Sequence, residues 1–223
     1  MNKSFNKLPV HIAFILDGNG RWALKHHHDR NYGHLMGLKN LKNIVKECRN
    51  LNIKYISLYC FSVENMKRDA NEVNYLMDLA RKEFQDVHDK LDSYDYNIRI
   101  IGEKTNLKED IIDIINKINS KNFIEDAFTV FICFNYSSQI EIFNASRNVE
   151  TIEELERNLY TYPAPMIDLI IRTSGEERLS NFMLYQASYA ELYFDKRYWP
   201  DFHKKSLYRA LREYQKRKRN FGK

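Results

Sequence analysis

The sequence of 223 residues predicts an α/β fold in a single domain, residues 1–223, with a mainly parallel central sheet of about six strands surrounded by helices. Short apolar runs rich in β-branched and aromatic residues alternate with longer stretches of helical periodicity. Only seven glycines and four prolines occur, too few for a turn-rich all-β fold. A chain of this length buries roughly 70–75% of its unfolded surface, so one core suffices.

Six short runs are expected to form the sheet, because each is dominated by the apolar side chains of strands buried on both faces. Alternation within the run "FTVFICF" predicts that Phe128, Val130, Ile132 and Phe134 share one face. The expected strands are residues 10–16, 53–61, 98–101, 128–134, 167–171 and 191–194.

The clearest predicted helix spans residues 71–92, where apolar residues recur at intervals of three and four and form one stripe. Residues 35–51 repeat this pattern, residues 107–118 do so more weakly, and "NFMLYQASYAEL" at 181–192 is helix-like. The segments "KNFIED" and "TYPAP" are typical of loops. No linker or internal repeat divides the chain.

The net charge of +5 is unevenly distributed, because residues 203–223 contain nine lysines or arginines and one acid, Glu213. This stretch is expected to be a basic C-terminal helix and tail. Its charge permits nucleic acid, a phospholipid surface or a diphosphate as partner without choosing among them.

The cysteines and the hydropathy indicate a cytoplasmic protein. Cys48, Cys60 and Cys133 lack metal-ligand spacing and are interpreted as reduced core thiols. The apolar runs are far shorter than the about 20 residues that cross a bilayer, and no secretory signal is visible.

Polar clusters follow four of the predicted strands. They are "DGNGRW" (17–22), "SVENMKR" (62–68), "NYSSQ" (135–139) and "RTSGEERLSN" (172–181). Because the carboxyl ends of parallel strands meet at one edge of a sheet, where ligands bind in α/β folds, we expect these clusters to form one site.

The first cluster suits an anionic ligand with a metal. Gly18 and Gly20 allow a close backbone approach, and Arg21 adds a cation. Asp17 would repel a phosphate unless Mg²⁺ lay between them, and Mg²⁺ commonly takes one or two carboxylates together with phosphate oxygens. The alternative is a simple turn in which Asp17 caps the following helix.

Two further clusters add arginines. Arg30 and His34 would share a face of a helix, where Arg30 suits a phosphate and His34 can exchange a proton near neutrality. Arg172, Arg178 and Ser180 precede the helix-like stretch, an arrangement suited to a diphosphate. The alternatives are ordinary surface residues at a helix end and surface arginines paired with nearby glutamates.

The cluster at 62–68 allows two interpretations. Ser62, Asn65 and Arg68 follow a strand and precede the long helix, so the loop could close over a substrate. Alternatively, Ser62 or Asn65 caps a helix and Arg68 is solvated.

Several long segments resemble, in order, the signature motifs of the cis-prenyltransferases, the undecaprenyl diphosphate synthase family. They are "HIAFILDGNGRWA", "RNYGH", "LYCFSVENMKR" and "DLIIRTSGEERLSNFMLYQASYAELYF…WPDF", spanning residue 11 to about 202. The resemblance implies a parallel sheet surrounded by helices and a homodimer of the bacterial type. It also implies that an allylic diphosphate, such as farnesyl diphosphate, is elongated with isopentenyl diphosphate to a long-chain Z-polyprenyl diphosphate such as undecaprenyl diphosphate.

The same resemblance implies roles for individual residues. Asp17 and Glu191 would hold Mg²⁺, with Asp17 assisting departure of the diphosphate. His34, Ser62 and Asn65 would support that departure or proton transfer. The residues that would bind the two substrates are Gly18, Asn19, Gly20, Arg21, Trp22, Arg30, His34, Arg68, Arg172, Arg178 and Ser180.

The resemblance also implies where the product forms and goes. The growing chain would enter a tunnel between the sheet and helices, with the helix at 71–92 as one wall and Phe128 as a candidate floor. The enzyme would act in the cytoplasm near the inner membrane face, where its product partitions. Arg219 to Gly222 would reach the partner subunit's site.

Departures from the family pattern leave alternatives. Met66 stands where Trp is usual, Asp69 where Pro is frequent, and Ser137-Ser138-Gln139 where Gly-Gly-Arg is usual. The other candidates are a synthase of shorter chains, a non-catalytic subunit of a prenyltransferase complex, and an RNA-binding protein that uses the basic tail. We expect no nucleic-acid partner. A trans-prenyltransferase would carry paired DDxxD motifs, which this sequence lacks.

Overall fold

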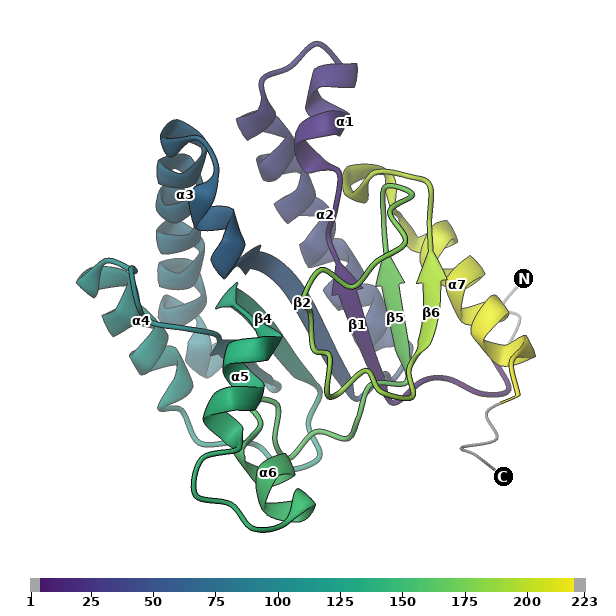
Figure 1. Ribbon diagram of the computed structural model, residues 1–223. Coiled ribbons are helices and arrows are strands. Elements are labelled where there is room, and N and C mark those ends of the chain that lie inside the picture. The colour runs from purple at the N-terminus through teal and green to yellow at the C-terminus, as the bar shows by residue number, and fades with distance from the viewer. Residues whose placement is uncertain (1–4, 219–223) are drawn as a thin grey trace.

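Six parallel strands form one sheet in the order β3-β4-β2-β1-β5-β6 in the computed structural model, which describes residues 5–218 (Figure 1). The prediction of a parallel sheet of about six strands is therefore confirmed. The predicted tail beyond residue 218 lies outside the described residues. The strands are β1 His11–Ile15, β2 Tyr55–Ser62, β3 Asn97–Ile101, β4 Thr129–Tyr136, β5 Leu169–Arg172 and β6 Glu191–Phe194.

Helices connect the successive strands from β1 to β5, as the periodicity predicted, whereas an irregular segment joins β5 to β6. Among residues 5–218, no helix is both long and apolar enough to cross a membrane. The α-helices are α1 Asn19–Lys25, α2 Arg30–Asn50, α3 Ala70–Asp89, α4 Glu109–Asn119, α5 Ser138–Ala145, α6 Ile152–Asn158 and α7 Lys204–Lys216. Short 3-10 turns are η1 Val63–Lys67, η2 Leu91–Ser93 and η3 Trp199–Asp201.

Two aspartates explain where the long helices begin. The Asp29 side chain accepts a hydrogen bond from the amide of Tyr32, so α2 starts five residues before the apolar periodicity that predicts it. Asp69 accepts from the amides of Asn71 and Glu72 at the start of α3. The Asp69 departure from the family pattern thus supplies an N-cap.

The helix-like stretch 181–192 is not a regular helix, so that prediction was wrong. Ser180, Asn181 and Met183 have φ of 51°, 59° and 45°, which a right-handed helix does not allow. The burial of Phe182 and Met183 against the sheet decides the conformation, because apolar spacing alone does not distinguish a helix from a folded-in loop.

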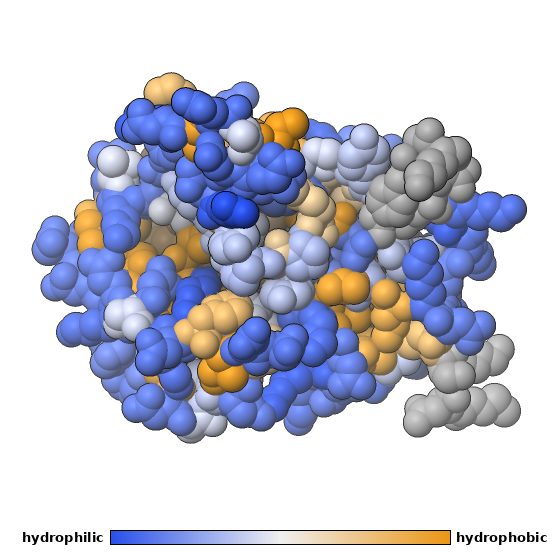
Figure 2. Space-filling model, turned by 90° about the horizontal axis from the view of Figure 1, so that it is seen from below, coloured by the Kyte–Doolittle hydropathy of each residue, from blue (hydrophilic) through white to orange (hydrophobic). Residues whose placement is uncertain are grey.

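Both faces of the sheet are covered, and β1 lies at its centre. Ile12 and Phe14 belong to the core cluster shared with α2 and α7, whereas Ala13 and Ile15 face the opposite cluster, which includes residues of the segment 179–190. All five residues of β1 are buried. Seen from below in the view of Figure 1, the surface is mainly hydrophilic with separate apolar groups (Figure 2), as is usual for a folded protein.

The connections place the ligand-binding edge of the sheet between β1 and β5. The chain leaves β1 toward β2 on one side and leaves β5 toward β6 on the other. Such a reversal opens a crevice beyond the carboxyl ends of the two strands. The four polar clusters follow β1, β2, β4 and β5, so the expectation that they share one edge is confirmed.

His11 sits at the start of β1 and is fully buried. Its Nδ1 donates to the carbonyl oxygen of Pro165 at 2.8 Å, so Nε2 accepts from the Ser57 hydroxyl, also at 2.8 Å. Burial lowers the pKa of this imidazole to about 4. The folded protein therefore holds His11 neutral at a pH where the unfolded chain protonates it.

We expect this histidine to lower the free energy of unfolding at acidic pH. Because its folded pKa is depressed, its contribution is complete above pH 6.5 and is lost as the pH falls toward 4. Between pH 7 and pH 4.5 the loss should be about 2 to 3 kcal/mol. Urea unfolding of the wild type and of His11→Gln at both pH values measures it. Equal losses in the two proteins would contradict the assignment.

Candidate active site at the carboxyl ends of β1 and β5

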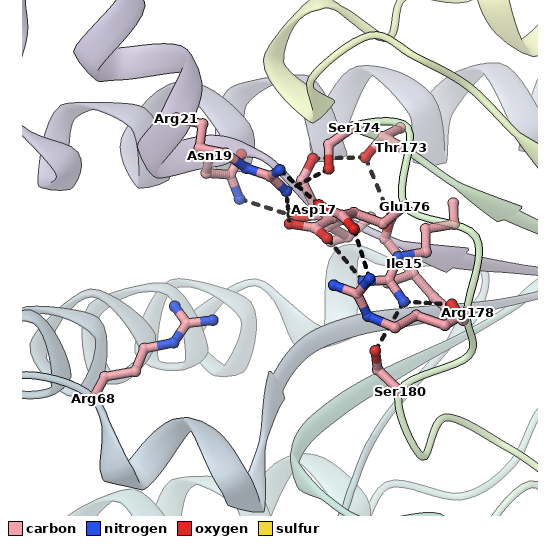
Figure 3. Close-up of polar contacts among 12 residues, drawn as sticks. Ile15, Asp17, Asn19, Arg21, Arg68, Thr173, Ser174, Glu176, Arg178 and Ser180 are labelled. Carbon is pink, nitrogen blue, oxygen red and sulfur yellow. Dashed lines mark hydrogen bonds and ion pairs between the residues drawn. The ribbon is translucent and has the colours of Figure 1, made fainter.

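A buried ion pair joins the ends of β1 and β5. Arg172, the last residue of β5, donates from Nη2 to Oδ2 of Asp17 at 2.9 Å, with side chains that are 4% and 27% exposed. The parallel register sets Ile15 opposite Arg172, which brings Asp17 within reach. The Asp17 carbonyl oxygen accepts from the Thr173 hydroxyl (Figure 3). It also accepts from the Trp199 amide, so the backbone at Asp17 is fixed as well.

The remaining nitrogens of Arg172 organise the loop that follows β5. Nη1 donates to the Ser180 hydroxyl at 2.8 Å and to the carbonyl oxygen of Arg178. Nε is buried and has no hydrogen-bond partner within residues 5–218. A buried donor without a partner favours the binding of a further acceptor at this position.

Two more arginines surround the ion pair. Arg21 donates from Nη2 to Asp17 at 3.1 Å and to the Ser174 hydroxyl at 2.6 Å, and from Nη1 to Glu176 at 2.7 Å. Arg178 contacts the other Glu176 oxygen at 2.6 Å. The hydrogen bonds from Arg21 and Arg178 hold the pKa of the Glu176 carboxyl below its usual range. Without a ligand, Asp17 and Glu176 neutralise these guanidinium groups. The arginines therefore do form the predicted cluster, and they also make the ion pairs with acidic residues that were the alternative interpretation.

A second charged cluster is centred on Glu72 of α3 and lies across the crevice from Asp17. Its carboxylate accepts from Arg30 Nε at 2.9 Å and Arg68 Nη1 at 3.0 Å, and contacts His34 Nε2 at 3.2 Å. Figure 3 shows Arg68 on the opposite side of the opening from Asp17. Sequence reasoning missed Glu72, although its i,i+4 spacing from Arg68 was a usable signal.

His34 is placed to remain neutral. Burial lowers its pKa below the usual value, and the hydrogen bond to Glu72 opposes this effect only in part. The imidazole therefore donates Nε2–H to the Glu72 carboxylate at neutral pH and can accept a proton elsewhere.

Two glycines, one in α1 and one in α2, allow the turn after β1 to pack closely against α2. A Cβ on Gly20 would lie 2.7 Å from the Arg30 guanidinium carbon, and one on Gly37 would lie 2.2 Å from Oδ1 of Asn19. Gly18 has φ of 102°, which disfavours any other residue. The predicted turn is therefore packed directly against Arg30 and α2.

Three predicted site residues make contacts outside these clusters. Ser62 and Asn65 form a reciprocal capping box at η1, in which the Asn65 amide donates to the Ser62 hydroxyl and the Ser62 amide donates to Oδ1 of Asn65. Trp22 donates its indole N–H to Asp201 at 2.9 Å. The capping interpretation of the 62–68 loop therefore holds, and the loop also carries Arg68 into the second cluster.

Glu191 lies far from Asp17 within one chain. It begins β6 and pairs in register with Leu169, three residues before Arg172, a separation of about 10 Å along the strand. Its carboxylate contacts Arg217 at 2.7 Å. The structure thus does not bring together the two carboxylates expected to share a metal. Within residues 5–218, no group of three or more histidine, cysteine or acidic side chains forms a metal cluster.

An apolar cavity of about 450 Å³ runs between the sheet and the helices α2 and α3. One end is lined by Asn19 and His34, beside the charged clusters, and the other by Tyr94 and Tyr96 near the amino end of β3. The exposed Cys60 lines this cavity and is therefore not the core thiol expected. Along the walls are Leu38, Leu41, Leu58, Leu76, Ala80, Val130, Ile132 and Phe134.

The alternation predicted for β4 is correct for the three residues within the strand. Val130, Ile132 and Phe134 all line the cavity. Phe128 precedes the strand and is not among the lining residues of the described chain; its ring lies 5.8 Å from that of Tyr96. Tyr96, not Phe128, therefore closes this part of the cavity.

Comparisons with known proteins agree with this geometry. The family described as putative undecaprenyl diphosphate synthase matches residues 15–222. An isoprenyl transferase of Thermotoga maritima is 42% identical, covering 97% of both chains. A tritrans,polycis-undecaprenyl-diphosphate synthase (geranylgeranyl-diphosphate specific) of Methanocaldococcus jannaschii is 38% identical, covering 98% of this chain and 84% of its own.

Solved structures match nearly the whole fold. Lavandulyl diphosphate synthase from Lavandula x intermedia, in complex with dimethylallyl diphosphate, superposes with a TM-score of 0.87 at 29% identity, covering 97% of this chain and 99% of its own. A probable undecaprenyl diphosphate synthase from Campylobacter jejuni gives 0.77 at 28% identity, covering 98% and 100%.

The parallel sheet, the arginine clusters and these matches define an isoprenyl transferase. The chain belongs to the undecaprenyl diphosphate synthase family of cis-prenyltransferases.

Replacing Glu72 with Gln should lower the pKa of His34 further. The carboxylate raises that pKa, and its loss leaves Arg30 and Arg68 to oppose protonation. An NMR titration of the imidazole, assigned with His34→Gln, measures the change. Glu176→Gln, which alters the other cluster, should leave it unaffected. A His34 pKa that stays constant or rises in Glu72→Gln would refute the coupling.

Proposed function

We propose that the protein condenses isopentenyl diphosphate onto an allylic diphosphate, farnesyl diphosphate, and so makes a long-chain Z-polyprenyl diphosphate such as undecaprenyl diphosphate. The observation that carries the proposal is the apolar cavity that opens beside two arginine clusters. An allylic diphosphate has the same division into a charged head and an apolar tail. A shorter product or a non-catalytic role remains an outcome of the experiments below.

The allylic diphosphate is assigned to the first turn of α1. Arg21 and Arg30 flank this turn, and Gly18, Asn19 and Gly20 present its backbone. Asn19 also lines the cavity mouth, so a diphosphate bound here directs its apolar tail into the cavity. Trp22 and Arg68 complete this proposed site, with Arg68 supplied by the loop after β2.

Isopentenyl diphosphate is assigned to Arg172, Arg178 and Ser180. The buried Nε of Arg172 is a donor in need of an acceptor, and the Arg178 side chain is 61% exposed. A diphosphate can replace Glu176 as the partner of Arg178 with modest loss, because an exposed ion pair contributes little.

The donor chemistry of Asp17 fits Mg²⁺. Its carboxylate is 27% exposed at the centre of the arginine cluster, and Mg²⁺ is usually held by one or two carboxylates with substrate phosphates and water. Bound there, Mg²⁺ would neutralise charge on the departing diphosphate. Because Glu191 lies at the other end of β6, we assign the metal to Asp17 alone within one chain.

The remaining chemistry is a carbon–carbon bond formation with loss of a proton. The bond between C1 and the diphosphate oxygen of the allylic substrate breaks, the double bond of isopentenyl diphosphate attacks C1, and a proton leaves to form the cis double bond. Neutral His34 is a proposed acceptor for that proton or a donor to the diphosphate. Ser62 and Asn65 hold the loop that carries Arg68.

We further propose that the chain acts as one catalytic domain in a cytoplasmic homodimer at the inner membrane face, where its lipid product partitions. The dimer is what the resemblance of the sequence motifs implies, and the basic residues of α7 are compatible with an anionic surface. No nucleic-acid partner is proposed.

Purified protein given farnesyl diphosphate, labelled isopentenyl diphosphate and Mg²⁺ should form a labelled polyprenyl product, and a chelator should stop it. Asp17→Asn should reduce turnover at least about 100-fold, because it removes a charge that acts on the departing group. Asp113→Asn, an exposed change on α4, is the control. Activity of Asp17→Asn near that of the control would exclude the proposed role.

The cavity predicts an effect on product length. Cys60 lies on β2 and is exposed to the cavity. In Cys60→Trp the indole should occupy the space of the growing chain and shorten the product by one or more five-carbon units. Cys60→Ala should leave the length unchanged. Chromatography of the dephosphorylated products measures their length. Identical product lengths for both variants would show that the growing prenyl chain does not enter this cavity.

A further inference from the structure

The segment that carries Arg178 and Ser180 has an unfavourable backbone conformation. Ser180, Asn181 and Met183 all have positive φ, at 51°, 59° and 45°. Residues other than glycine are disfavoured in this region. Such a conformation persists only where surrounding contacts enforce it. The contacts that hold this segment therefore determine where the Ser180 hydroxyl lies.

Those contacts come from the first turn of α5. The amides of Ser138 and Gln139 donate to Asn181, at its carbonyl oxygen and at Oδ1, both at 3.1 Å. The Asn181 side-chain amide donates to the Ser137 hydroxyl at 2.8 Å, and the Leu184 amide donates to the Ser138 hydroxyl at 2.8 Å. Four hydrogen bonds thus hold Asn181 and Leu184, the residue that follows Met183.

Two of the four require serine side chains. The bonds from the backbone amides of residues 138 and 139 would survive any ordinary substitution, whereas the bonds to Ser137 and Ser138 need a hydroxyl oxygen. Glycines at these two positions would lack both acceptors. Ser137 has φ of −143°, an extended backbone that needs no glycine, and Ser138 is fully buried.

Asn181 connects the serines to the remainder of the site. Its second side-chain hydrogen donates to Glu64 of η1 at 3.0 Å, so the loops after β2, β4 and β5 meet at this residue. Directly before it in the chain, Ser180 accepts from Arg172, which pairs with Asp17. A shift of Asn181 would therefore move Ser180 relative to Arg172.

We propose that Ser137 and Ser138 are positioning residues for the diphosphate of isopentenyl diphosphate: they hold the segment 178–184 in its strained form and so place Arg178 and Ser180. This inference rests on the proposed function, because it names the substrate of that site. It assigns to this chain a more rigid binding loop than one with Gly-Gly at the same positions would have.

The test is the double variant Ser137→Gly/Ser138→Gly in steady-state kinetics. KM for isopentenyl diphosphate should rise about fivefold, because two hydrogen bonds that fix the bound conformation are lost. The kcat should change less than about twofold, and KM for the allylic diphosphate should not change. Ser146→Gly is the matched control, because Ser146 lies at the opposite end of α5 and its hydroxyl donates to the carbonyl oxygen of Phe143. A variant in which kcat falls and KM is unchanged would overturn the proposal.

Three further measurements separate positioning from helix stability, since Ser137 is also the N-cap of α5. Ser137→Thr retains a hydroxyl and should keep the wild-type KM. The single variants Ser137→Ala and Ser138→Ala avoid added glycine flexibility, and each should raise KM in the same direction. Without ligand, the Leu184 amide should exchange hydrogen faster in Ser138→Ala than in the wild type. Unchanged exchange at Leu184 would refute the contact.

Binding of labelled isopentenyl diphosphate alone, without an allylic substrate, tests the proposed function separately from the proposed role of Ser137 and Ser138. Absence of binding and turnover in the wild type would reject the proposed function. A wild type that binds and turns over, beside a double variant with the same affinity, would reject only the role of Ser137 and Ser138.

Discussion

The ion pair between Arg172 and Asp17 is the constraint on which the site depends. A guanidinium that is 4% exposed at the end of a core strand is strongly destabilising unless a carboxylate and further acceptors surround it. Asp17 at the end of the neighbouring strand meets that need, and Ser180 supplies another acceptor. The loops after β1 and β5 must therefore converge. Their arginines are in place before an anion arrives, which limits the reorganisation that binding requires.

A single sheet produces both halves of the site. Its carboxyl edge gathers charged side chains, whereas one face of β2 and β4 presents Leu58, Val130 and Ile132 to the cavity. Because side chains alternate along a strand, every second residue faces the cavity and the others face the opposite side of the sheet. The charged residues come after the strand ends and so lie beyond the apolar wall. The glycines of α1 and α2 join the halves, because they let the turn after β1 lie against α2 at the cavity mouth.

The sheet, the long helices and the shared edge could be predicted from the sequence, because burial on two faces and helical periodicity leave local signals. The segment 181–190 could not, since its apolar residues are placed by contacts with β-strands and α5 distant in the chain. Glu72 looks like an ordinary acid in the first turn of a helix until α2 brings Arg30 and His34 beside it. Within one chain Glu191 does not lie beside Asp17, because strand register, which a motif does not reveal, puts it at the amino end of β6.

The cavity has a consequence for the helix that forms its outer wall. Of the 20 residues of α3, only Met77 and Phe84 are buried. A helix with so few core contacts is held less firmly than the central strands, and segments of this kind open locally without global unfolding. The pocket thus has one compliant side and one stiff side. Under the proposed function, a lengthening hydrocarbon would displace α3 more readily than the sheet that holds the charged edge.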